Sequence, residues 1–225
     1  MNGHLEIAKW LAEQDGVSLT AEDNDGWQPI HGACGDGHLE VVKWLAKQDG
    51  VSLMDQDQKG WQPIHYACDN AHLELVKWLA AQHGVSMTAE CIDGSQPIHH
   101  ACRGGQLEVV KWLANQYEAL TAEDKEGRQP IHHACEGGHL KVVKWLLEAK
   151  ADVNLKDLKG RNALYFACWN ANETVLSALV HAGADIQARN RWLETPLHYV
   201  AVCRVACGMM SVDMHDVVRS TENVR

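Results

Sequence analysis

The sequence has few of the features that direct a protein to a membrane or to nucleic acid. None of its apolar runs approaches the roughly 18 residues of a membrane-spanning helix, and its opening residues, MNGHLEIAKW, lack the layout of a secretory signal peptide. Basic residues are scarce, with 20 against 30 acidic ones and a formal charge of −10. Cationic side chains supply most non-specific affinity for nucleic acid. We therefore expect neither a membrane nor a nucleic acid as partner.

Sequence signatures of common catalytic sites are also missing. The chain has no glycine-rich loop of the kind that cradles phosphate and no nucleophile elbow. Histidines and carboxylates are plentiful, but they recur at regular intervals, whereas an active site needs different groups to converge irregularly in one pocket. We predict that the protein is not an enzyme and holds no cofactor.

What the sequence has instead is an internal repeat. The string QPIHxAC begins at Gln28, Gln62, Gln96 and Gln129, and each copy is followed by LEVVKWLA or a near copy of it. Corresponding tryptophans lie 34, 34, 34 and 33 residues apart, at Trp10, Trp44, Trp78, Trp112 and Trp145. A fixed period of this length predicts a solenoid in which each unit contacts only its neighbours.

One unit can be interpreted as a turn followed by two short helices. Asp57 to Gly60 form the turn, which closes a hairpin finger, and Pro63 suits the first position of a helix. Apolar residues then recur at helical spacing in two stretches, first at Ile64, Ala67 and Cys68 and then at Leu73, Val76, Leu79 and Ala80. We expect the two helices to be antiparallel.

A unit of about 33 residues in which PIHxA opens the first helix and GHLxVVKxL the second resembles the ankyrin repeat. The resemblance covers almost the whole chain and is fullest from Gly127 to Asn154. It implies an all-α fold, an ankyrin-repeat solenoid of stacked helix-turn-helix units with short hairpin fingers. It also implies that partners bind at the finger tips, the inner face of the first helix and the loop between helices.

The two ends depart from the pattern. Residues 1–24 correspond to a truncated repeat with only its second helix, residues 25–203 to the ankyrin array, and residues 204–225 to a degenerate repeat, a cap or a tail. Terminal repeats normally carry a polar outer face, which the first segment lacks, so we expect the sequence to be part of a longer chain. Met210, Met214, Val217 and Val218 fall at helical spacing, which leaves both a capping helix and a tail open.

The cysteines and histidines of the repeat invite other interpretations. One repeat position holds Cys34, Cys68, Cys102, Cys135 and Cys168. Neighbouring helices lie about 8–10 Å apart, whereas a disulfide needs Cα atoms within about 7 Å, so these cysteines cannot pair along the stack. Unpaired buried cysteines favour a reducing compartment, which predicts a cytoplasmic protein, with the nucleus as the other choice.

A histidine precedes four of these cysteines by three residues, at His31, His65, His99 and His132. Zinc needs about four ligands at 2.0–2.3 Å, and each unit offers two, so we predict no metal site. The ankyrin resemblance implies that this histidine braces neighbouring fingers through hydrogen bonds. Glutamine stands before each PIH string where the ankyrin family prefers threonine, and only Thr195 keeps it, so we predict weaker helix caps.

Candidate binding residues lie where the units differ. These positions follow the finger glycine, follow the framework histidine, or lie in the loop between helices. They are Trp27, Trp61, Tyr66, Asp69, Asn70, His100, Arg103, Arg128, His133, Glu136, Arg161 and Trp169. Large aromatic and arginine side chains at exposed points are typical of interface anchors. The alternative is that they are tolerated surface residues. The tryptophans of the second helix favour packing on the convex side, with a binding ridge as the alternative.

Charge changes along the fingers. Acidic residues begin the row at Glu22, Asp23 and Asp25, and basic residues end it at Lys156, Lys159, Arg161, Arg189 and Arg191. Complementary potentials orient partners, which predicts a ligand with a basic segment toward the N-terminal fingers. We expect a protein–protein interaction module that binds a partner protein on its concave finger and inner-helix surface, in a scaffold or adaptor role. The alternative is an architectural spacer without a dedicated ligand.

Overall fold

The computed structural model describes residues 3–117 and 119–203 of the 225-residue chain. Twelve α-helices and one 3-10 turn occur in these ranges, and they contain no strand. The all-helical solenoid predicted from the repeat is therefore confirmed. The predicted cap or tail at 204–225 lies outside the described residues.

The helices alternate between two rows. The first helices of the units are α2 (Pro29–Gly35), α4 (Pro63–Asp69), α6 (Pro97–Arg103), α8 (Pro130–Glu136), α10 (Ala163–Trp169) and α12 (Pro196–Cys203). The second helices are α1 (Gly3–Ala12), α3 (Leu39–Leu45), α5 (Leu73–Ala80), α7 (Leu107–Tyr117), α9 (Leu140–Glu148) and α11 (Glu173–His181). The 3-10 turn η1 (Ala119–Thr121) follows α7.

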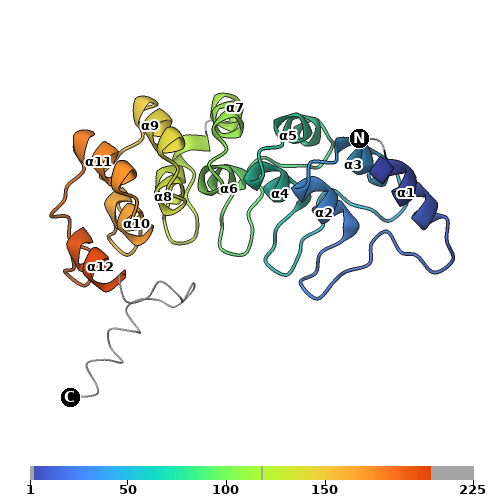
Figure 1. The fold of residues 1–225 in the computed structure, drawn as a ribbon, viewed down its shortest axis with the longest axis horizontal. Coiled ribbons are helices and arrows are strands. Elements are labelled where there is room, and N and C mark those ends of the chain that lie inside the picture. The colour runs from blue at the N-terminus through green and yellow to red at the C-terminus, as the bar shows by residue number, and fades with distance from the viewer. Residues whose placement is uncertain (1–2, 118, 204–225) are drawn as a thin grey trace, which may run out of the picture.

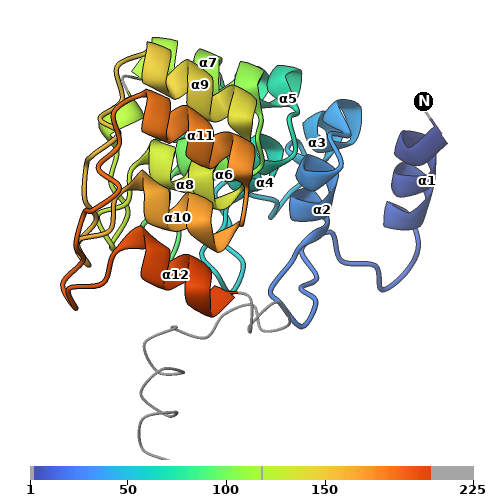
Figure 2. The same cartoon turned by 60° about the vertical axis from the view of Figure 1, so that its left-hand side comes forward.

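The units stack into one elongated body from which the fingers all project on the same side (Figure 1). First helices of neighbouring units pack more closely than second helices do, so the stack curves toward the first helices and the fingers. We call the exposed faces of the fingers and first helices the inner surface. At the N-terminal end, α1 lies beside α3 (Figure 2).

A continuous core runs along the stack between the two rows. In the second unit, Ile64, Ala67 and Cys68 are fully buried, as the repeat pattern predicts. On α5 the buried residues include Leu75, while Leu73 is only partly buried. A helix between two neighbours buries a wider face than its apolar stripe alone indicates. The tryptophans Trp44, Trp78, Trp112 and Trp145 pack against this core.

Each finger is a tight hairpin that is bonded to the next one. In the second finger, the Asp57 N–H donates to the Trp61 carbonyl oxygen at 3.1 Å, and the Gly60 N–H to that of Asp57 at 2.9 Å. Backbone hydrogen bonds also run between fingers, since the Gln58 N–H donates to the Asp25 carbonyl at 3.0 Å. The fingers therefore stack in a fixed register.

The glutamines that precede the first helices have an extended backbone, and the histidine at the third helical position accepts the N–H of each one. The lower strength expected of these caps, relative to threonine, stays a prediction.

Candidate functional site

The histidine of each PIH string ties its unit to the next one. In the second unit, His65 Nδ1 accepts a hydrogen bond from the Gln62 N–H at 2.9 Å, and Nε2 lies 3.0 Å from the Ala89 carbonyl oxygen. Because Nδ1 accepts, the ring proton is on Nε2 and donates to that carbonyl. His31, His99 and His132 repeat both contacts. The predicted bracing role is confirmed, and both ring nitrogens are used by backbone groups.

Burial keeps three of these imidazoles neutral. It lowers the pKa of His65, His99 and His132, against the opposing effect of the carbonyl that each one faces. Burial also raises the pKa of the Cys68 and Cys102 thiols well above the usual range, so these cysteines stay protonated and act as small core residues.

In the second, third and fourth units, the side chain after the bracing histidine points back to the base of its own finger. Tyr66 donates its hydroxyl hydrogen bond to Asp57 Oδ2, and His133 Nε2 lies 3.0 Å from Asp124 Oδ2. In the third unit, His100 Nε2 lies 3.7 Å from the sulfur of Cys91. Each pair is separated by nine residues and joins the first helix of the unit to its finger.

These contacts correct one expectation from the sequence. Tyr66, His100 and His133 were expected at exposed points, but their exposed fractions are 6%, 1% and 1%. The reason is that the finger folds over the start of the first helix and uses the polar tip of each side chain. Burial lowers the pKa of His133 to about 3, although its hydrogen bond to Asp124 acts in the opposite direction. The pair is a neutral imidazole beside a carboxylate.

The N-terminal half of the inner surface is aromatic. The rings of Trp27 and Tyr66 lie 4.7 Å apart, edge to face, and those of Trp61 and Tyr66 lie 4.9 Å apart. The two indoles flank a hollow of about 130 Å³ lined by Asp25, Trp27, Asp57, Lys59, Trp61 and Tyr66. We call it the finger hollow. Trp27 is 37% exposed there, whereas Trp61 is more covered.

Arg103 of the third unit packs on Trp61 of the second unit. Its guanidinium carbon lies 5.4 Å from the centre of the Trp61 ring, and its Nη2 donates to His100 Nδ1 at 3.0 Å. The arginine thus covers one face of the indole and fixes the tautomer of the buried imidazole. This candidate residue has an internal structural role.

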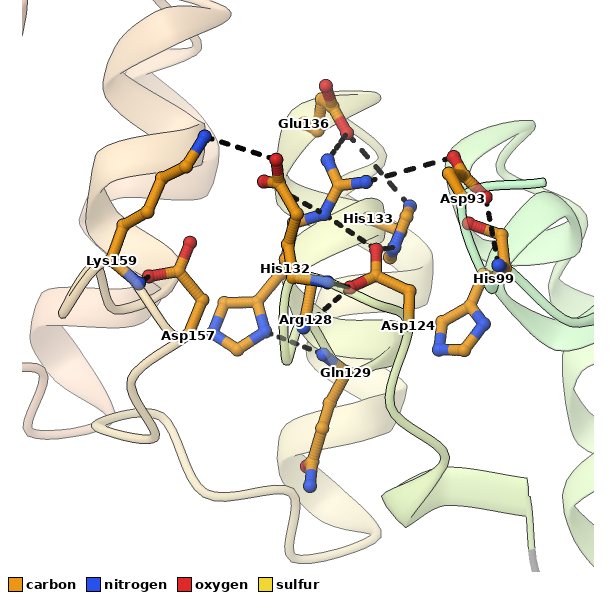
Figure 3. Close-up of polar contacts among 12 residues, drawn as sticks. Asp93, His99, Asp124, Arg128, Gln129, His132, His133, Glu136, Asp157 and Lys159 are labelled. Carbon is orange, nitrogen blue, oxygen red and sulfur yellow. Dashed lines mark hydrogen bonds and ion pairs between the residues drawn. The ribbon is translucent and has the colours of Figure 1, made fainter.

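The C-terminal half of the inner surface is a ladder of ion pairs. Arg128 Nε lies 2.7 Å from Asp124 Oδ2, and its other nitrogens approach Glu136 and Asp93 at 3.6 and 4.0 Å. Figure 3 shows this guanidinium among the three carboxylates. Burial alone raises the pKa of Asp124, but the hydrogen bonds from His133 and the Arg128 backbone, with the Arg128 charge, lower it overall.

Glu126 extends the ladder to the following unit. Its two oxygens each lie 3.1 Å from a cation of the next finger, Lys159 Nζ and Arg161 Nη2. Arg161 also binds Asp157 at 2.6 Å and lies over the Phe166 ring at 4.8 Å. Two of the basic residues predicted to give this end a positive potential are therefore paired internally.

The acidic end differs from the basic end. Across residues 3–117 and 119–203, Glu22, Asp23 and Asp25 have no cationic partner within 4 Å, and all three are exposed. Asp23 Oδ1 accepts the N–H groups of Asp25 and Trp27 at 2.9 Å, which shapes the first finger. The acidic side chains at the N-terminal fingers thus have no ion-pair partner in these ranges, while two of the five basic residues at the other end, Lys159 and Arg161, are paired.

The remaining candidates lie at the ends of first helices. Asp69 is partly buried, and burial raises the pKa of its carboxyl. Asn70 is exposed and donates to the Tyr66 carbonyl at 3.2 Å. Trp169 is 39% exposed at the end of α10, in the charged half of the stack. The structure does not bring Trp169 into the aromatic group at the first two fingers.

Sequence reasoning did not select Lys59 and Glu126 as site residues. Both precede the finger glycine, in a column that reads Asp25, Lys59, Asp93, Glu126 and Lys159. Opposite charges one period apart in this column could have indicated ion pairs between fingers, and the Glu126–Lys159 pair has that origin.

Within the part of the chain that the structure describes, no group of three or more His, Cys, Asp or Glu side chains is placed to hold a metal ion. Nor is any helix in those ranges long and apolar enough to cross a membrane. A larger groove of about 780 Å³ lies between α9 and α11 on the outer row, and none of the candidate residues lines it.

The geometry defines a class of protein: stacked helical hairpins whose fingers are bonded in series by a bracing histidine. The sequence model of ankyrin repeats, which spans three copies, matches residues 1–91, 82–157 and 98–190. The chain therefore belongs to the ankyrin repeat family. Members of this family are generally protein–protein interaction modules and are typically not enzymes. No curated protein matches the chain.

Proposed function

We propose that the protein binds a partner protein along its inner surface, with the first two fingers as the main contact, in a scaffold or adaptor role. The observation that carries the proposal is the contrast between the two halves of that surface. Around Glu126 the charged groups are paired with one another. Around Trp27 the surface offers an exposed indole and unpaired carboxylates.

Physical chemistry favours the unpaired half as the contact. Buried aromatic anchors contribute much of the affinity of protein interfaces, while charged groups at the rim set orientation and association rate. Trp27 and Asp25 meet these needs without breaking an internal ion pair. Engaging Arg128 or Arg161 would instead require the partner to compete with Asp124 or Asp157.

Selection from a displayed library of random 16-residue peptides tests the proposal. We expect soluble copies of enriched peptides to bind in calorimetry, and the double variant Trp27→Ala/Trp61→Ala to lose about tenfold or more in affinity, as typical of aromatic anchors. Trp10→Ala is the matched control, because Trp10 is 60% exposed on α1, away from the fingers. An architectural spacer would select no peptide, and loss of binding in the control alone would place the contact elsewhere.

Charge reversal tests the predicted orientation of the partner. We expect Glu22→Lys/Asp25→Lys to slow association about tenfold at low ionic strength, since attraction between opposite charges speeds encounter, with a smaller effect at high salt. Asp23 is left intact because it shapes the finger. Glu40→Lys/Glu74→Lys makes the same charge change on the outer helices and should leave the rate nearly unaltered. Stopped-flow fluorescence measures both, and equal effects of the two variants would refute a basic segment at these fingers.

We propose that the protein resides in the cytosol or the nucleus. Its support is the row of buried, protonated thiols, which a reducing environment keeps intact.

A further inference from the structure

The finger hollow has the composition of a site for a cation. Tyr66 lines it, and its ring is held in place because the hydroxyl binds Asp57. The rings of Trp27 and Trp61 stand at 75° and 49° to the Tyr66 ring, and both indoles also line the hollow. Aromatic faces attract cations through the negative potential of their π electrons.

Elsewhere along the stack an arginine already lies on an aromatic ring. Arg103 covers Trp61 at 5.4 Å, Arg161 covers Phe166 at 4.8 Å, and Arg191 covers Trp192 at 4.1 Å. The position that supplies Arg103 to Trp61 is occupied one unit earlier by Asp69. In the described ranges no cation stacks on Trp27. This indole therefore keeps a face that its own chain does not cover with positive charge.

Charge around the hollow is also negative. Asp25 and Asp57 line it, and Glu22 and Asp23 lie on the same finger as Asp25. Asp57 is buried and already accepts the N–H groups of Lys59 and Trp61, so its carboxylate is fixed and cannot turn away. Asp25 is exposed and has no ion pair in the part of the chain described.

Lys59 is the one cation in the lining. In the fifth finger the equivalent Lys159 reaches Glu126 of the finger before it at 3.1 Å, but Lys59 has no carboxylate within 4 Å among the described residues. Its side chain is exposed. Lys59 therefore competes with an incoming cation for the same negative potential without filling the hollow.

From these contacts we infer that the finger hollow receives a lysine or arginine side chain of the partner protein, with the cation against Trp27 and Asp25 and the alkyl stem between the two indoles. The inference rests on the proposed function, because it names the side chain that anchors the partner at the first two fingers. Lys59 lowers the affinity of this site.

Short peptides test the inference without any known partner. The probes are acetyl-Gly-Lys-Gly-amide, its arginine analogue, and a norleucine analogue that keeps the alkyl stem but lacks the charge. NMR follows the indole N–H signals of the full chain. We expect the lysine and arginine probes to shift the Trp27 and Trp61 signals saturably, with a dissociation constant on the order of 10 mM. The signals of Trp10 and Trp169 should not move.

Variants separate the contributions. Asp25→Asn and Trp27→Ala should each weaken the lysine probe about two- to fivefold, and Lys59→Gln should tighten it by a similar factor. Asp25→Asn and Lys59→Gln alter exposed side chains, so unchanged Trp10 and Trp169 signals verify the fold. Equal affinity for norleucine, no shift with either cationic probe, or insensitivity to Asp25→Asn and Trp27→Ala together would overturn the inference.

The two proposals fail separately. Displayed peptides that bind the first two fingers but contain no lysine or arginine would uphold protein binding and remove the cation site. Saturable binding of the lysine probe with no selected peptide would uphold the cation site and remove the wider interaction surface.

Discussion

The histidine three residues after the glutamine that precedes a first helix makes one contact within its own unit and one with the next unit. In the second unit, Nδ1 of His65 receives the Gln62 N–H at the start of α4, while Nε2 reaches Ala89 in the next unit. The same ring therefore satisfies an orphan donor of a helix and a carbonyl of a neighbouring turn. In the fifth unit a tyrosine replaces it, and the Tyr165 hydroxyl donates to the Ala188 carbonyl at 2.8 Å.

Gln62→Thr should stabilise the protein by about 1 kcal/mol, the usual value of a helix cap. A threonine hydroxyl at this position can accept a backbone N–H of the first helical turn. Urea denaturation measures the gain in the free energy of unfolding. Gln56→Thr, at an exposed position before the finger, is the control and should change little. If the two substitutions had the same effect, the start of α4 would not be the cause.

At the scale of elements, the stacking of the fingers decides which glycines can be replaced without loss of stability. Gly94 has a φ of +79°, and a Cβ there would lie 2.7 Å from the backbone nitrogen of Lys125 in the next finger. That nitrogen donates to the Asp93 carbonyl at 2.9 Å, so the clash falls on the bond between two fingers. Gly32 lies within α2 and has open space around its Cα.

Two alanine substitutions should therefore change the free energy of unfolding in opposite directions. Gly94→Ala should lower the free energy of unfolding by about 1–3 kcal/mol because of left-handed strain and the contact with Lys125. Gly32→Ala should raise it by about 0.5–1 kcal/mol, since alanine favours the helix. Chemical denaturation of both variants checks the prediction. Destabilisation by Gly32→Ala, or tolerance of Gly94→Ala, would contradict the finger stacking.

For the whole molecule, the buried histidines form a row that runs through the middle units. Burial is the main cause that lowers the pKa of His65, His99, His100, His132 and His133. Two neighbouring pairs of rings lie 5.1 and 4.8 Å apart, His65 with His100 and His99 with His133, so a proton on one ring would further disfavour a proton on the next. The stack is therefore built to hold neutral imidazoles.

Acid should destabilise the array in a defined window. Unfolded histidine has a pKa of about 6.5, so below that pH the unfolded chain binds protons that the folded chain excludes, and the free energy of unfolding falls. One pH unit below 6.5, His133, whose folded pKa is about 3, costs roughly 1 kcal/mol, and the other four histidines act in the same direction. Urea denaturation between about pH 7.5 and 5 should show a free energy of unfolding that falls with falling pH, with full stability at the upper end.

A variant tests whether the buried row of histidines causes the slope of the free energy of unfolding against pH. His133→Phe should flatten it by about one histidine's share, because phenylalanine already occupies this position at Phe166 and takes up no proton. His83→Gln, in an exposed loop after α5, is the control and should keep the slope of the unmodified protein. A pH-independent stability, or equal slopes in the two variants, would show that the row does not control acid sensitivity.

Much of the fold could be predicted because each unit repeats the same local chemistry. Pro63 marks a helix start and Gly60 a turn of positive φ, and both are found there. Binding residues were harder to predict. Tyr66 and His133 differ from unit to unit as binding residues do, yet both are buried by contacts with their own fingers. A position that varies among the repeats can therefore hold either an interface residue or a residue that pairs with another variable position of its own unit.

The sequence alone determined the period, the two helices of each unit, the bracing histidine and the family, because these depend on neighbours within one repeat and recur in every copy. Only the tertiary structure decided that Glu126 pairs with Lys159 and Arg161, and that Trp27, Trp61 and Tyr66 enclose a hollow. Most of those contacts join side chains of adjacent units. Whether they touch depends on how closely adjacent fingers stack and how each side chain turns, and packing between units sets both.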